Sequence, residues 1–124
     1  MSGESRTPAA LAAYRVVDLS DSVGGQFCAR LFADMGADVA LVEPPEGSAT
    51  RRMGPFDRRG RSLQFFHLNH NKKILASTGG EPVGDGLLRT ADVVITSGGL
   101  DEGRALAINP ALVLVEVTPF GTDG

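Results

Sequence analysis

Arginines are concentrated in one short segment of this chain, although its net charge is -3. Five of them fall within 11 residues around Asp57: Arg51, Arg52, Arg58, Arg59 and Arg61. Guanidinium groups pair with phosphate oxygens through a planar fork of N–H donors, so the segment could attract a polyphosphate ligand. The alternative is a solvated loop whose arginines pair with carboxylates elsewhere in the fold. Charge alone does not decide between the two.

Two adjacent glycines follow a predicted strand, at a place where many α/β proteins bind phosphate. The turn reads DLSDSVGGQF, from Asp18 to Phe27, and Glu43 follows at about the distance expected of a ribose-binding acid. The dinucleotide fingerprint needs three spaced glycines, however, and this turn does not contain them. The pattern therefore argues against an NAD site. The first N–H groups of a helix starting here could still receive a phosphate or carbonyl oxygen.

Other reactive side chains occur in patterns that do not favour catalysis or metal binding. His67 and His70 are three residues apart without a nearby cysteine or acidic partner, so a surface or packing role is expected rather than a metal site. Cys28 lies on a predicted apolar helix face and is expected to be part of the core. Ser97 lacks the G-x-S-x-G surroundings of a hydrolase nucleophile.

These residues must be positioned by alternating strands and helices. Apolar and β-branched runs predict strands at residues 15–19, 39–42, 73–76, 92–96 and 112–118. Apolar residues at helical spacing predict a helix that runs from the two glycines to Met35, with Gly36 as its C-terminal stop. Shorter helices are expected at residues 87–89 and 100–107, whereas residues 62–67 fit either a strand or a helical turn.

Alternating strands and helices predict an α/β fold, with a Rossmann-like, mostly parallel sheet and flanking helices. We expect residues 1–12 to form a flexible tail and residues 13–124 to form the domain. Ligands of such sheets bind beyond the carboxyl ends of the strands. The segments that follow the strands are therefore the candidate site: Ser20–Gly25, Glu43–Arg52, Ser97–Gly99 and Pro119–Gly124.

The composition limits the class of protein further. Hydrophobic residues make up 42% of the 124 positions and charged residues 22%, which is ordinary for a globular domain. The acidic net charge argues against a nucleic-acid partner, and no apolar run approaches the roughly 20 residues that cross a bilayer. One cysteine and the lack of a signal-like N-terminal segment lead us to expect a cytoplasmic protein.

The pattern as a whole resembles the N-terminal portion of the class III CoA-transferases, the group that contains formyl-CoA transferase, carnitine CoA-transferase and α-methylacyl-CoA racemase. The resembling blocks cover the chain from about residue 11 onward: RVVDLS, LFADMGADVALVEPPEG, Arg51, LNHNKK, ADVVI and NPALVLVEVTPFGTDG. Taken singly each block is modest, but their order and spacing are specific. After ADVVI this chain has Ser97-Gly98-Gly99-Leu100, where the family usually has Asn-Phe or Asn-Arg-Pro-Gly.

The resemblance implies coenzyme A as a substrate, with no permanently bound cofactor and no metal. It implies that seven residues contact or border CoA: Val23, Gly24, Arg51, Lys72, Ser97, Gly98 and Arg104. The arginine-rich segment would then suit the 3′-phosphate and pyrophosphate of CoA. The catalytic aspartate of the family lies downstream of the GTDG block, and none of Asp18, Asp92 and Asp123 aligns with it.

The resemblance therefore implies an N-terminal part of an enzyme that moves CoA between an acyl-CoA and a carboxylic acid through that downstream aspartate. We expect an incomplete domain, no catalytic residue within this chain and no turnover by the chain alone. The full-length parent would be an interlocked homodimer. Two alternatives stay open at this point: part of an acyl-CoA racemase, or a non-catalytic module that binds CoA, a nucleotide or another protein.

Overall fold

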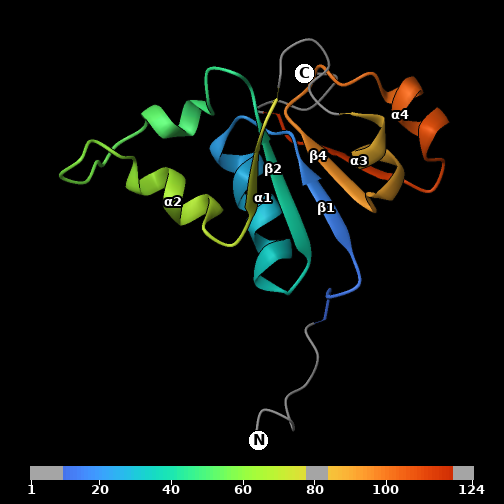
Figure 1. Cartoon of the computed structure of the whole chain (residues 1–124), viewed down its shortest axis with the longest axis horizontal. Coiled ribbons are helices and arrows are strands. Elements are labelled where there is room, and N and C mark those ends of the chain that lie inside the picture. The colour runs from blue at the N-terminus through green and yellow to red at the C-terminus, as the bar shows by residue number, and fades with distance from the viewer. Residues whose placement is uncertain (1–9, 78–83, 119–124) are drawn as a thin grey trace, which may run out of the picture.

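A computed structural model describes residues 10–77 and 84–118 of the chain. Its centre is a parallel sheet of five strands in the order β3-β2-β1-β4-β5 (Figure 1). The strands are β1 Arg15–Asp18, β2 Asp38–Glu43, β3 Lys73–Ala76, β4 Val93–Thr96 and β5 Val113–Glu116. The predicted α/β fold with a parallel sheet is thus confirmed.

Helices connect the strands. They are α1 Val23–Asp34, the short 3-10 helix η1 Ala49–Arg52, α2 Leu63–Asn69, α3 Asp85–Thr90 and α4 Glu102–Ile108. The ambiguous segment is α2, because Ser62 caps its first turn through the Phe65 N–H and because Phe65 and Leu68 are buried at helical spacing. The helix η1 lies in a segment that was expected to be loop.

Alternate residues of each strand pack on opposite faces of the sheet. On one face Val16, Val39 and Ile95 form a cluster with Ala29 of α1. On the other face Val17 and Val94 pack with residues of α3 and α4. Burial of both faces explains why β1, β2 and β4 are mostly apolar, as the sequence indicated, whereas every residue of β3 is exposed.

The ends of α1 show why its limits could be predicted. Ser22 is the N-cap, and its hydroxyl accepts a hydrogen bond from the Gly25 N–H at 3.2 Å. Gly36 follows the helix with a φ of 97°, a left-handed conformation that glycine adopts without strain. Gly25 is also required for space, since an added Cβ would lie 2.3 Å from the Ser20 Cβ. The turn and the helix therefore pack directly against each other.

Two parts of the predicted organisation lie outside the described residues or differ at their limits. Most of the expected tail, residues 1–9, falls outside them, as does the whole candidate-site segment Pro119–Gly124 with its GTDG block. The last strand ends at Glu116 rather than at Thr118. Among the described residues, no helix is long and apolar enough to cross a membrane.

Candidate functional site

The order of the strands reverses between β1 and β4. From β1 the chain builds the sheet outward through β2 and β3, and from β4 it builds outward through β5 on the other side. Ligands of open parallel sheets bind at such a switch point. A crevice of about 230 Å³ lies there, and its walls come from the segments that follow β1, β4 and β5: Ser22, Gly24, Ser97, Val117 and Thr118.

The first turn of α1 offers hydrogen-bond donors to this crevice. The N–H groups of Val23 and Gly24 belong to the first turn, where a helix has no acceptor of its own for them. The positive end of the helix dipole adds to their attraction for an anion or a carbonyl oxygen. Gly24 also keeps the crevice open, since an added Cβ would lie 3.4 Å from Cγ1 of Val117.

Ser97 joins the two loops at the switch point. Its Oγ accepts a hydrogen bond from the Asp21 N–H at 3.1 Å and lies 3.3 Å from Oγ of Ser22. Thr118 also lines the crevice, and its buried hydroxyl has no hydrogen-bond partner within the described part of the chain. Because buried hydroxyls are rarely left unpaired, Thr118 is available to a polar group in the crevice.

Gly98 shapes the loop after β4. Its φ is 117°, and its N–H donates to Oγ1 of Thr96 at 3.0 Å. The Thr96 hydroxyl in turn donates to the Gly98 carbonyl at 3.2 Å. Only glycine adopts this conformation readily, so the loop turns sharply beside the strand end. The sharp turn leaves Ser97 beside the first βα loop.

A buried ion pair joins the end of β1 to the residue before β3. Nζ of Lys72 donates to Oδ2 of Asp18 at 2.8 Å, and both side chains are inaccessible to solvent. The ammonium also donates to the Gln26 carbonyl at 2.9 Å and to Oδ1 of Asn69 at 2.6 Å. Asp18 accepts through its other oxygen from the N–H and hydroxyl of Ser20. The geometry therefore gives the ammonium three acceptors and the carboxylate three donors.

Burial governs the titration of this pair. Loss of solvent raises the pKa of Asp18, against the lowering effects of the Lys72 charge and of the Ser20 hydrogen bonds. Loss of solvent likewise lowers the pKa of Lys72, against the attraction of Asp18. Each charge is thus sustained by its partner, since an isolated buried charge is strongly disfavoured.

Gln26 extends the buried polar network from α1 to η1 and α2. Its amide nitrogen donates to the Ser20 carbonyl at 3.2 Å and to Oγ of Ser48 at 3.3 Å. Its amide oxygen accepts from the hydroxyl of Thr50 at 2.7 Å and from the Asn69 amide at 3.0 Å. All four hydrogen-bonding positions of this fully buried amide are therefore used.

Glu43, at the end of β2, forms an ion pair with Arg51, which follows it in the sequence. Arg51 donates to both carboxylate oxygens of Glu43 at 2.7 Å, and its guanidinium lies 4.0 Å from the centre of the Phe65 ring. Glu43 also accepts from the Ser48 N–H at 2.7 Å. Burial raises the pKa of Glu43, but the hydrogen bonds from Arg51 and Ser48 outweigh it and leave that pKa below its ordinary value.

The structure brings four of the seven predicted CoA-binding residues together. Gly24 and Ser97 line the crevice, Val23 begins the helix that borders it, and Gly98 follows Ser97. The other three lie elsewhere. Arg104, on α4, pairs with Asp85 of α3. Contact of the seven residues with CoA stays a prediction.

Lys72 and Arg51 have other roles in this arrangement. The three donors of Lys72 are engaged by Asp18, Gln26 and Asn69, which suits a positioning role, and its contact with CoA stays a prediction. Arg51 holds Glu43, although 44% of its side chain is exposed. Arg61 also pairs with a carboxylate, that of Asp57. These two ion pairs weaken the interpretation that the arginine segment attracts a polyphosphate ligand.

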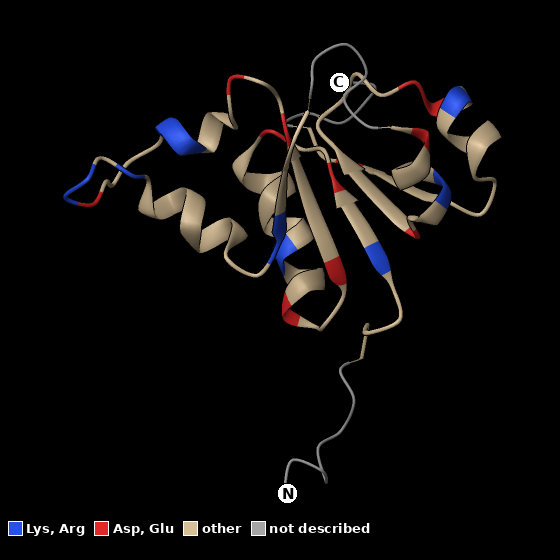
Figure 2. Cartoon of the chain, in the orientation of Figure 1, with Lys and Arg blue, Asp and Glu red and all other residues tan. Residues whose placement is uncertain are grey.

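The arginine segment and the crevice lie in different parts of the fold. Figure 2 shows the cationic residues of η1 and of the loop before α2 at one side of the molecule, beyond β2. The crevice, by contrast, is lined by residues that follow β1, β4 and β5. Among the described residues, those that line the crevice carry no side-chain charge.

Sequence reasoning missed the buried polar residues. Asp18 was compared only with the nucleophile of the family, and Gln26 and Asn69 had no assigned role within the quoted motifs. Asp18 had a signal that could have been used, because an acidic residue directly after two valines in a buried strand needs a partner. The partner itself lies 54 residues away, and no local pattern identifies it.

The histidines and the cysteine have ordinary surroundings. Nε2 of His67 lies 2.7 Å from Nη1 of Arg30. Burial raises the pKa of the half-buried Cys28 thiol, which packs against the α1 face of the core. In residues 10–77 and 84–118, no cluster of three or more His, Cys, Asp or Glu side chains is arranged to hold a metal ion.

Comparison with known proteins gives a consistent result. The family model of CoA-transferase family III matches residues 11–124. The chain is 34% identical to succinyl-CoA--D-citramalate CoA-transferase of Chloroflexus aurantiacus, over 96% of this chain and 33% of that protein. It is 35% identical to succinate--glutarate CoA-transferase of Agrobacterium fabrum, over 92% of this chain and 33% of that protein. The chain thus spans about a third of the length of the curated relatives it matches.

Solved structures agree with the sequence comparison. A CAIB/BAIF family protein from Brucella suis superposes with a TM-score of 0.81 at 33% identity, over 95% of this chain and 35% of that one. The protein Rv3272 from Mycobacterium tuberculosis gives a TM-score of 0.77 at 29% identity, over 94% and 35%. The arrangement of strands and helices is therefore that of a part of these proteins.

Proposed function

The chain belongs to CoA-transferase family III, and from this premise we propose that it supplies a CoA-binding part of an enzyme that moves CoA from an acyl-CoA to a carboxylic acid. The crevice between β1 and β4 is the observation that carries the proposal. It places the first turn of α1, whose N–H groups at Val23 and Gly24 have no acceptor within the helix, beside the hydroxyls of Ser97 and Thr118. These groups suit the phosphate, hydroxyl and amide groups of CoA.

In this proposal the residues of the chain bind and orient CoA. The N–H groups at the start of α1 donate to a phosphate or amide oxygen of CoA, and Thr118 and Ser97 offer hydroxyls on either side. Asp18, paired with Lys72, holds Ser20 in the turn that leads to α1. The acyl transfer itself is assigned to the aspartate that the resemblance implies downstream.

The partners of the whole protein follow the same premise. Relatives of this chain are named for succinyl-CoA and for dicarboxylic acids such as glutarate and malate. We extend only the general class to this chain: an acyl-CoA donor and a carboxylic acid acceptor. A homodimeric, cytoplasmic parent enzyme is also part of the proposal, and it rests on the resemblance.

Two matched substitutions test the proposed crevice. Gly24→Ala adds a methyl group at the crevice wall, whereas Gly86→Ala adds one to α3 in open space. Both place alanine in a helix, so their gains in helix propensity are similar. We expect CoA, measured by isothermal titration, to bind more weakly to Gly24→Ala and unchanged to Gly86→Ala. Equal affinities, or binding of NAD as strongly as CoA, would contradict the proposal.

A further inference from the structure

The segments that follow β1, β2 and β4 are joined at Asp21, an exposed residue of the first βα loop between β1 and α1. Oδ1 of Asp21 accepts a hydrogen bond from the Ala49 N–H at 2.6 Å, across 28 residues of sequence. The N–H of Asp21 donates to Oγ of Ser97 at 3.1 Å, across 76 residues. One surface residue thus connects three segments that are distant in the sequence.

The contact with Ala49 caps a helix from outside its own segment. Ala49 is the first residue of η1, and the N–H groups of a first helical turn have no acceptor within the helix. Ser48, the N-cap residue, caps none of the described N–H groups of η1 with its side chain. Its Oγ accepts from the Gln26 amide at 3.3 Å instead. The Asp21 carboxylate therefore takes the place of a local cap, and its charge strengthens the hydrogen bond.

Asp21 is adjacent to the CoA crevice but is not one of the described residues that line it. Ser22, the next residue, lines the crevice and caps α1 by accepting from the Gly25 N–H. Ser97, which accepts from the Asp21 N–H, belongs to the same lining. A displacement of Asp21 would therefore move both serines, and with Ser22 the first turn of α1.

We propose that Asp21 is a positioning residue for CoA. Its carboxylate fixes the first βα loop to η1, and it thereby holds the N–H groups of Val23 and Gly24 and the hydroxyl of Ser97 in one arrangement. The inference rests on the proposed CoA crevice and adds to it a residue that acts through its neighbours. Binding groups that are held in place beforehand lose less conformational freedom when the ligand arrives, which raises the affinity.

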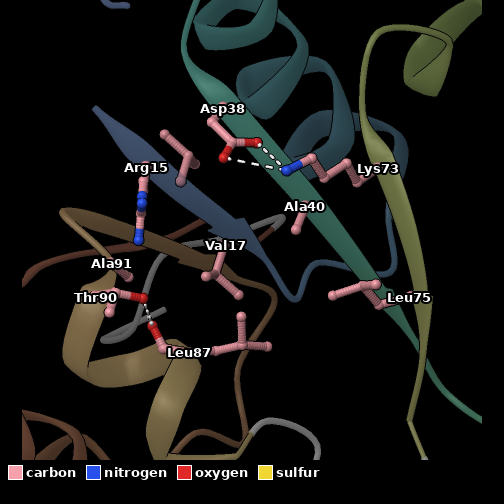
Figure 3. Close-up of a pocket in the computed structure, with 10 residues that line it drawn as sticks. Arg15, Val17, Asp38, Ala40, Lys73, Leu75, Leu87, Thr90 and Ala91 are labelled. Atoms are coloured by element: carbon pink, nitrogen blue, oxygen red, sulfur yellow. Dashed lines mark hydrogen bonds and ion pairs between the residues drawn. The ribbon is translucent and has the colours of Figure 1, made fainter. Parts of the chain in front are cut away.

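A second carboxylate makes the same kind of contact at the other end of the strands and provides a matched control. Oδ2 of Asp92 accepts from the Arg15 N–H at 2.8 Å, across 77 residues of sequence. Arg15 begins β1 and lines, with Asp38 and Lys73, a groove of about 400 Å³ (Figure 3). This groove and the CoA crevice share none of the described residues. Loss of the Asp92 contact should therefore leave CoA binding unchanged.

Three variants separate positioning from charge and from general stability. Asp21→Ala removes the acceptor of the Ala49 N–H, whereas Asp21→Asn keeps a side-chain oxygen there without the charge. Asp92→Ala removes the control contact. By isothermal titration we expect CoA to bind about three- to tenfold more weakly to Asp21→Ala, and within about twofold of the wild-type affinity to the other two variants.

Amide NMR without CoA tests how Asp21 acts. In Asp21→Ala the signals of Ser22, Gly24 and Ser97 should shift, because the loop that carries Asp21 loses its attachment to η1. Asp92→Ala should leave these signals in place, and the same spectra establish that each variant is folded. Unchanged signals at all three residues in folded Asp21→Ala would overturn the proposal.

The pattern of CoA affinities decides the remaining alternatives. Equal affinity of Asp21→Ala and the wild-type protein would overturn the positioning role and leave the proposed crevice intact. Equal weakening by Asp21→Ala and Asp92→Ala would assign the effect to stability, and equal weakening by Asp21→Ala and Asp21→Asn would assign it to charge. Tighter binding by both Asp21 variants would mean that the carboxylate repels CoA. Each of these three results overturns the proposal, whereas no CoA binding by the wild-type protein would contradict the proposed function itself.

Discussion

Asp18 and Glu43 end neighbouring strands, and each pairs with a cation from the segment between β2 and β3. Asp18 and Lys72 are both fully buried, whereas 44% of the Arg51 side chain that holds Glu43 is exposed. The two pairs have similar distances but different surroundings. Water can solvate the Glu43–Arg51 pair if one partner is lost, but it does not reach the Asp18–Lys72 pair. Burial, rather than the number of hydrogen bonds, should therefore decide how much each pair matters.

The largest effect is expected from Lys72→Met. This substitution leaves the Asp18 carboxylate buried without its cation, which costs about 3–5 kcal/mol in comparable cases. The free energy of unfolding in urea measures the loss. A loss below about 1 kcal/mol would show that Asp18 finds another partner or takes up a proton at little cost.

The double variant Asp18→Asn, Lys72→Met sharpens this prediction. It removes both charges, so no buried charge is left unpaired. We expect the double variant to be more stable than the sum of the two single losses predicts, as in a double-mutant cycle of interacting residues. Additive losses would mean that the two side chains act independently.

The next largest effect is expected from Gln26→Leu. Leucine has a similar size, but it leaves the Thr50 hydroxyl and the Asn69 amide without the acceptor they share. Each unsatisfied buried group costs about 1–3 kcal/mol. The midpoint of thermal unfolding measures the loss. Phe32→Leu, elsewhere on α1, is a control for altered packing, because Phe32 packs against the apolar core and makes none of these hydrogen bonds.

Glu43→Gln should have a smaller effect, and one that depends on pH. The pKa of Glu43 is lowered from 4.5, so its carboxylate stabilises the fold above that pH. This stabilisation is lost as the pH falls through the lower, folded-state pKa. We expect Glu43→Gln to lose up to about 1 kcal/mol at pH 7 and to show a flatter decline of stability below pH 4.5. An unchanged pH profile would contradict the assigned role of the Arg51 pair.

Lys73→Met should have the smallest effect. Lys73 is adjacent to Lys72 in sequence, but its ion pair with Asp38 is exposed, with 69% of its side chain accessible. Exposed pairs contribute little, so we expect a change within about 0.5 kcal/mol in urea unfolding. Equal losses for Lys72→Met and Lys73→Met would remove the distinction between the two pairs.

The fold was predictable from the sequence because its signals are local. The valines of β1 and β4, the Ser22 cap and Gly36 lie within or beside the elements they define. The helix α2 was ambiguous because its seven residues are too few to show a clear period. The helix η1 was missed because it lies among the Pro, Gly and Arg residues of an expected loop.

The candidate site was only partly predictable. Gly24 and Ser97 follow strands that the sequence identified, and the switch point brings them to one crevice. Lys72 was selected for its charge and its place in a resembling block, but its position is set by a contact with Asp18, 54 residues away along the chain. Burial of a lysine depends on long-range packing, and that information is not contained in its neighbours along the chain.

The most direct test of the proposed crevice is an amide NMR titration of the protein with CoA. We predict that the largest shifts occur at Val23, Gly24, Ser97 and Gly98, with smaller shifts along the arginine-rich segment. Largest shifts between Arg51 and Arg61, with none at the start of α1, would contradict the account and place CoA on the charged segment instead.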